Sequence, residues 1–185
     1  MRPPKLIKPS VLAFCRELVT NPQPCYVPVR PLDKVPANEC FTIVPQHVAE
    51  NGGMQIIGWS IWQWPRVLIE AEFHCVWQTT DGQLLDVTPK SIRVPRILFL
   101  PDPRRSYAGR QVDNVRRPLK HDPVIARFCR VAARIYAELN AGELADVHGE
   151  IPMTEQLHQL CSEKEHLLRV LASRYGLNSP ETSAA

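Results

Sequence analysis

The sequence predicts an α+β fold: a helix carrying Cys40 packed on a small antiparallel β-sheet, with a pair of helices at the C-terminal end. Two patterns support this class. Residues 54–100 contain apolar stretches of strand-like composition separated by turn residues. From residue 123 onward, apolar side chains instead recur at the spacing of amphipathic helices. This order, with a sheet followed by helices, is typical of α+β proteins.

The composition excludes several classes of protein. A chain of 185 residues suits one domain, or one domain with an appendage. The hydrophobic share of 44% and charged share of 22% exclude disordered, collagen-like and coiled-coil proteins. No apolar run approaches the roughly 20 residues that span a bilayer, no secretory signal is visible, and a net charge of +3 is too small to indicate nucleic acid. We therefore expect a cytoplasmic protein with reduced thiols and neither membrane nor nucleic-acid partners.

Two helices are predicted in the first third of the chain. Ser10 is the expected N-cap of the first, because VLAFCRELVT places apolar side chains on one stripe. Residues 21–37 hold five of the 18 prolines and are predicted to be an extended connector. Asn38 is expected to cap a second helix that begins at the next residue and ends near Gly52. Pro45 predicts a kink in this helix or a new start at Pro45.

Strands are predicted over residues 54–62, 67–77 and 83–88, and an interrupted strand over residues 92–100. Turn residues between the second and third of these strands predict a hairpin.

The last third is predicted to be helical. One helix begins at Pro123, and a second covers residues 154–175. We predict a core over residues 1–120, a helical extension of the same domain over residues 121–178, and a frayed tail over residues 179–185.

The hairpin register decides where Asp86 points. A three-residue loop with Gly82 in the left-handed conformation places Val76 opposite Asp86, so that Asp86 lies diagonal to His74 on one face of the sheet. A two-residue turn would instead place Asp86 among the apolar side chains of the other face. Because register follows burial, we expect the three-residue loop.

Cys40, His74 and Asp86 are the expected nucleophile, base and orienting carboxylate of a catalytic triad. Cys40 falls in the first turn of its predicted helix, where the backbone N–H groups and the macrodipole favour a thiolate. The N–H of Cys40 and the side chain of Asn38 are expected to stabilise an oxyanion, and Trp59 is a candidate wall of the substrate site. These residues predict cysteine-dependent acyl transfer on a protein or peptide-like amide.

The cysteine at a helix start, the strand EAEFHCVW and the segment DGQLLDVTP resemble the core of transglutaminase-like proteins, within the wider papain-like cysteine fold. The resemblance covers roughly residues 36–90 and implies Cys40 as nucleophile, His74 as base and Asp86 as orienter. Segments from NECF to QVDNVRRPL also resemble uncharacterised bacterial proteins, some of which carry a zinc-chelating tail of the SEC-C type. This sequence shows no such tail, so no zinc is expected from the resemblance.

Two other functions are compatible with the sequence. Glu70, Glu72 and His74 alternate along one strand and are candidate ligands of a metal-dependent enzyme. The same fold also suits a non-catalytic binding or adaptor module that acts through the arginine-rich residues 104–120 or the terminal helices. No nucleotide-binding or zinc-protease motif occurs, and the six cysteines lack zinc-finger spacing, so the favoured triad enzyme is expected to use no cofactor or metal.

Overall fold

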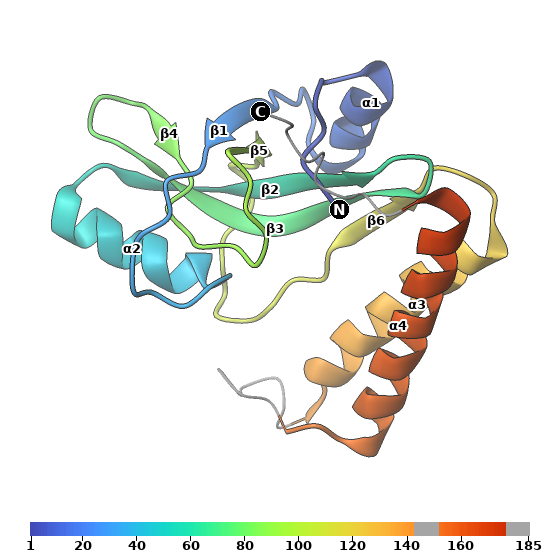
Figure 1. Cartoon of the computed structure of the whole chain (residues 1–185). Helices are drawn as coiled ribbons and strands as arrows, with labels where there is room; N and C mark the ends of the chain where they lie inside the picture. The colour runs from blue at the N-terminus through green and yellow to red at the C-terminus, as the bar shows by residue number, and fades with distance from the viewer. Residues whose placement is uncertain (143–151, 177–185) are drawn as a thin grey trace, which may run out of the picture. The chain divides into compact units, whose positions relative to one another are not determined.

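The computed structural model describes residues 1–142 and 152–176, and it confirms the α+β class (Figure 1). The described residues form four helices and a six-stranded antiparallel sheet. In chain order these are α1 (Pro9–Leu18), β1 (Cys25–Pro28), α2 (Cys40–Asn51), β2 (Met54–Trp64), β3 (Leu68–Gln78), β4 (Leu84–Leu85), β5 (Arg96–Pro101), β6 (Val115–Pro118), α3 (Pro123–Leu139) and α4 (Glu155–Tyr175).

The chain divides into two compact units. The sheet unit comprises Arg2–Trp62 and Glu70–Gly109, and the helical unit comprises Gln63–Ile69 together with the chain from Arg110 onward and Met1. This division differs from the predicted boundary at residue 120, because the turn between β2 and β3 groups with the helices. The predicted tail over residues 179–185 lies outside the described residues.

The sheet has the strand order β1-β5-β2-β3-β4, and β6 pairs with β3. Neither β1 nor β6 is predicted by the sequence, because β1 lies in the proline-rich connector and β6 in the arginine-rich segment. The edge position of β1 explains its composition, since an edge strand tolerates proline.

Two helix starts differ from the prediction. α1 begins at Pro9 with Lys8 as N-cap, so Ser10 is already inside the helix. α2 begins at Cys40 with Glu39 as N-cap, and no side chain donates or accepts a capping hydrogen bond there. Proline is favoured in the first turn of a helix, which explains the earlier start of α1. α2 runs without interruption through Pro45, so the helix does not restart at this residue.

The β3–β4 hairpin has the predicted three-residue loop and register. Trp77 pairs with Leu85, and Gly82 adopts a φ of 88°. The ladder then ends, because Asp86 forms a parallel bridge with Val29 instead of continuing along β3. The predicted strand over residues 83–88 is therefore shortened to two residues in β4.

Apolar side chains on both sides of β3 contribute to the core of the sheet unit. α2 lies alongside the strands (Figure 1), and Cys40 and Val44 pack with Cys75 and Val87 in one cluster. Val76 belongs to another cluster, with Trp62, Val27, Val94, Ile97 and Phe99. The helix therefore packs on the apolar face that carries Cys75.

The helical unit has its own core, in which Leu68 and Val67 pack against α3 and α4. Asp122 and Thr154 cap the two helices by accepting from the backbone N–H groups of Val124 and Leu157. Gly176 ends α4, as the sequence predicts. None of the helices in the described parts of the chain is long and apolar enough to cross a membrane.

Candidate active site

Cys40 is the first residue of α2 and is only 5% exposed. The first turn of any α-helix leaves backbone N–H groups without intrahelical partners, and the macrodipole adds positive potential there. Thr42 and Ile43 donate back to the carbonyl oxygen of Glu39. The N–H groups of Cys40 and Phe41 precede them in the first turn, where an oxyanion could accept hydrogen bonds.

Cys75 is the closest chemical neighbour of Cys40. Its Sγ donates to the backbone carbonyl oxygen of Cys40 at 3.2 Å, and the thiol is fully buried. The same thiol lies near the Cys40 sulfur and lowers the pKa of Cys40. The nucleophile predicted from the sequence therefore has a second cysteine beside it, which the sequence analysis did not assign to the site.

His74 and Asp86 form the pair that the hairpin register predicts. Nε2 of His74 lies 3.2 Å from Oδ1 of Asp86, and Asp86 is fully buried. The backbone N–H of Thr88 donates to the same oxygen at 3.2 Å. Because Nε2 is paired with Asp86, Nδ1 is the ring nitrogen that can exchange a proton with the thiol or its substrate.

Cys40 and His74 lie close together, although residues 74 and 75 point to opposite faces of β3. The charge of the His74 ring is near enough to the Cys40 thiol to lower its pKa. The structure thus brings Cys40, His74 and Asp86 together.

These contacts lower the pKa of Cys40 to about 4. The hydrogen bond from the Cys75 thiol lowers it most, and the charge and hydrogen bond of His74 add to the effect, while burial opposes them. The pKa of Cys75 is raised by burial and by the thiolate beside it. Cys40 therefore holds the negative charge of the pair, and Cys75 stays a neutral donor.

The pKa of His74 is raised to about 9. Burial has the largest single effect and lowers the pKa, and the charge of Lys90 acts in the same direction, but the charge and hydrogen bond of Asp86 and the charge of Cys40 together outweigh both. Burial also disfavours the charged form of Asp86, yet the imidazolium and a lysine lower the pKa of this carboxyl overall. Between about pH 4 and about pH 9 the site therefore holds a thiolate and an imidazolium.

Lys90 is a fourth charged member of the site. Its Nζ lies 2.8 Å from Oδ2 of Asp86 and 3.4 Å from Nε2 of His74, and its side chain is 8% exposed. The contact with Oδ2 is an ion pair without the alignment of a hydrogen bond. Lys90 is not predicted as a site residue from the sequence, where only its four-residue spacing from Asp86 points to the contact.

Asn38 and Trp59 do not have the places expected of substrate-binding residues. Asn38 has a φ of 65°, and its Nδ2 donates to Oγ of Ser91 at 3.1 Å. Trp59 is 2% exposed, and its indole N–H donates to Oδ2 of Asp102 at 3.2 Å. Its ring is part of the core and offers no surface to a substrate.

Phe41 and Tyr107 are the aromatic residues next to the nucleophile. Their rings stack at a centroid distance of 4.1 Å, and Phe41 also stacks on Phe73 at 5.0 Å. The pKa of Tyr107 is raised by burial and by the negative charges of Glu39 and Cys40, which places the phenol near the thiolate. The aromatic wall of the site is thus formed by Phe41 and Tyr107.

The alternative metal site is not assembled. Oε2 of Glu72 accepts from the indole N–H of Trp62 at 2.8 Å, while His74 faces Asp86. Within residues 1–142 and 152–176, no three His, Cys, Asp or Glu side chains form a group that could hold a metal ion.

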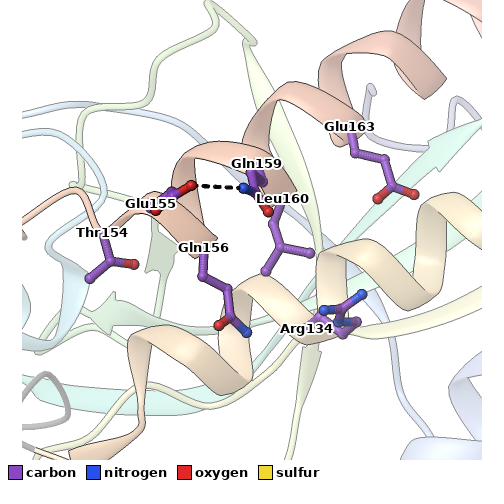
Figure 2. Close-up of a pocket in the computed structure, with 7 residues that line it drawn as sticks. All are labelled: Arg134, Thr154, Glu155, Gln156, Gln159, Leu160 and Glu163. Atoms are coloured by element: carbon purple, nitrogen blue, oxygen red, sulfur yellow. Dashed lines mark hydrogen bonds between the residues drawn. The ribbon is translucent and has the colours of Figure 1, made fainter.

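A separate groove lies in the helical unit (Figure 2). It is lined mainly by polar side chains of α3 and α4, including Arg134, Glu155 and Glu163. It contains no thiol or imidazole, so it is not a second candidate for thiol chemistry.

Comparison of the chain with protein-family models, curated proteins and solved structures finds no match.

Proposed function

We propose that this protein is a cysteine-dependent acyl-transfer enzyme of the amide hydrolase, deamidase or transamidase kind, with Cys40 as nucleophile. The observation that supports this most directly is the line of contacts from the Cys40 thiolate to His74 and from His74 to the buried carboxylate of Asp86. A thiolate beside an imidazolium is the activated form of a cysteine nucleophile.

The proposed reaction has two halves. The Cys40 thiolate attacks the carbonyl carbon of an amide, and the electron pair of the C=O bond moves to an oxyanion that accepts from the free N–H groups at the start of α2. When the C–N bond breaks, His74 gives its Nδ1 proton to the leaving amine and a thioester remains on Cys40. Water or a second amine then attacks the thioester, His74 takes up its proton, and the thiolate leaves.

The substrate proposed is a protein or peptide-like amide. We also propose a cytoplasmic location, because the reaction needs Cys40 as a thiol and reducing compartments keep thiols free. Cys40 is a free cysteine in the structure, as are the other five.

The burial of the nucleophile favours a second candidate function. Because Cys40 and His74 are only 5% and 4% exposed, a substrate must displace part of the aromatic wall to reach them. A non-catalytic binding module on the same fold would keep both residues covered permanently.

A small activated ester separates the two candidates. p-Nitrophenyl acetate should acetylate Cys40 and release a burst of p-nitrophenolate, and mass spectrometry of the quenched protein should find the acetyl group on Cys40. Cys40→Ser should abolish the burst, whereas Cys161→Ser, a matched change of a partly buried cysteine in α4, should leave it unchanged.

Iodoacetamide labelling gives an independent measurement of the thiolate. At pH 6, Cys40 should be alkylated faster than the other five cysteines, and His74→Ala should slow its labelling because the loss of the imidazolium raises the pKa of Cys40. A Cys40 that gives no acetyl adduct and labels equally in both proteins would contradict the acyl-transfer proposal.

A further inference from the structure

The side chain of Lys90 is almost completely buried, and its charged contacts among the described residues are with the candidate triad. Its Nζ is 2.8 Å from Oδ2 of Asp86, and its side chain is 8% exposed. A long cationic side chain is seldom buried without a charged partner, because the loss of hydration must be offset by pairing. Asp86 is therefore shared between two cations, with Oδ1 facing His74 and Oδ2 facing Lys90.

The shared carboxylate fixes the geometry of the site. A carboxylate with one partner can rotate about its Cβ–Cγ bond and still keep its ion pair. Lys90 on Oδ2 and the Thr88 N–H on Oδ1 act at both oxygens and oppose this rotation. Oδ1 is thereby kept at Nε2 of His74, which in turn keeps Nδ1 available for the thiol.

The lysine also changes the charge balance around the imidazole. The groups that face His74 are the Asp86 carboxylate, the Cys40 thiolate of α2 and the Lys90 ammonium, and its strand neighbour Cys75 is a neutral thiol. Without Lys90 the ring would face two anions with no opposing cation. Such a ring would hold its proton too tightly to give it to a leaving amine, because a general acid works best with a pKa near the pH of the reaction.

We propose that Lys90 is a positioning residue of this site, which holds the second oxygen of Asp86 and places a positive charge beside His74. This inference rests on the proposed function, since it assigns Lys90 a part in the same proton transfer. It predicts that removal of the ammonium makes His74 a weaker acid, and that restoring a cation at this position reverses the change.

The test is an NMR titration of His74 in protein with isotopically labelled histidine, with the His74 signal assigned by its absence in His74→Gln. In Lys90→Met the midpoint of the His74 titration should move upward by roughly one pH unit relative to the wild type. Lys90→Arg should return the midpoint towards the wild-type value. Lys164→Met, the same loss of charge at an exposed position of α4, should leave it unchanged.

Lys90→Gln provides a second neutral variant if the methionine variant does not fold, and its midpoint should also rise. A folded neutral variant with a wild-type or lower midpoint overturns the inference. Because the titration needs no substrate, its result is separate from the acylation test. An unchanged midpoint with normal acetylation of Cys40 removes only the role of Lys90, whereas a raised midpoint with no acetylation keeps the electrostatic role of Lys90 and removes the enzyme.

Discussion

Cys75 determines much of the acidity of Cys40 as a neutral thiol beside it. The thiol is fully buried and donates to the Cys40 carbonyl oxygen, and burial keeps Cys75 itself protonated. A serine can donate in the same way, whereas an alanine cannot. The identity of residue 75 therefore affects the nucleophile without any contact with a substrate.

We predict that Cys75→Ala raises the pKa of Cys40 above its value of about 4, by roughly one pH unit or more. The reason is that the hydrogen bond from Cys75 lowers this pKa most, and burial of the thiolate then acts with less opposition. The pH dependence of iodoacetamide alkylation at Cys40 measures the change. Cys75→Ser should stay close to the wild type, and equal midpoints in the alanine variant and the wild type would show that Cys75 is only a packing residue.

The ion pair predicts a bell-shaped pH dependence of acylation by p-nitrophenyl acetate. The rate should rise with pH through about 4 as Cys40 ionises and fall through about 9 as His74 loses its proton. Asp86→Asn should move the alkaline limb to lower pH, because the carboxylate raises the pKa of His74. An alkaline limb that stays in place in this variant would remove Asp86 from the triad.

The raised pKa of His74 also makes the stability of the fold depend on pH. Because its folded pKa of about 9 lies above the ordinary value of 6.5, protonation of His74 stabilises the fold fully below about pH 6.5, and this contribution is lost as the pH rises through about 9.

The sequence predicts part of this site and misses the rest for a physical reason. Strand alternation and the turn at Gly82 fix the faces of His74 and Asp86, because both depend on local rules. Lys90 follows β4 in a segment without regular periodicity, whose path depends on the distant pairing of Asp86 with Val29. No local pattern specifies that pairing, so the sequence cannot predict where Lys90 points.

At the scale of elements, the segment after β5 reaches the start of α2. Asp102 fixes its start, since its N–H donates to the carbonyl of Ile57 at 3.0 Å and its carboxylate accepts from Trp59. Five residues later, Tyr107 stacks on Phe41 and is still 36% exposed. The segment is thus held firmly at one end, and the phenol ring at the other end lies between solvent and the start of α2.

We predict that Tyr107→Ala increases the rate of iodoacetamide alkylation at Cys40 several-fold, because the loss of the ring opens the path to the thiolate. The measurement is made near pH 7, where Cys40 is ionised in both proteins and a change in its pKa has little effect. Tyr107→Phe keeps the stacked ring and should react like the wild type. An unchanged rate in the alanine variant would mean that the thiolate is reached by another path.

β1 is a strand that its amino-acid composition does not predict. β1 contains Pro28 and follows Pro24, so its sequence favours an extended connector, yet it pairs with β5 over four residues. Proline is compatible with this position because β1 is an edge strand, and the bridge between Val29 and Asp86 uses the carbonyl of Pro28 and needs no N–H from it. Neighbouring strands far along the chain supply the pairing, which local patterns do not report.

At the scale of the whole molecule, the candidate active site belongs to one of the two compact units, and the other unit has an apolar core of its own. Cys40, His74, Asp86 and Lys90 all belong to the sheet unit. Trp64 and Leu68 belong instead to the core of the helical unit, although they lie on β2 and β3. Their strand-like sequence does not reveal this, because an apolar residue at the end of a long strand has the same pattern whether it packs on a sheet or on helices.

Leu171 tests this division, because it is fully buried in α4 among the core residues of the helical unit. We predict that Leu171→Ala lowers the free energy of unfolding by about 2–5 kcal/mol, the usual loss for a buried leucine. Chemical denaturation followed by circular dichroism measures this loss. The pH midpoint of Cys40 alkylation should stay at its wild-type value, since the groups that set it lie in the other unit.

Val44→Ala is the matched control, because Val44 packs in the same cluster as Cys40 and its truncation should change both stability and the midpoint. A midpoint that moves equally in the two variants would show that the electrostatics of the site depend on the helical core.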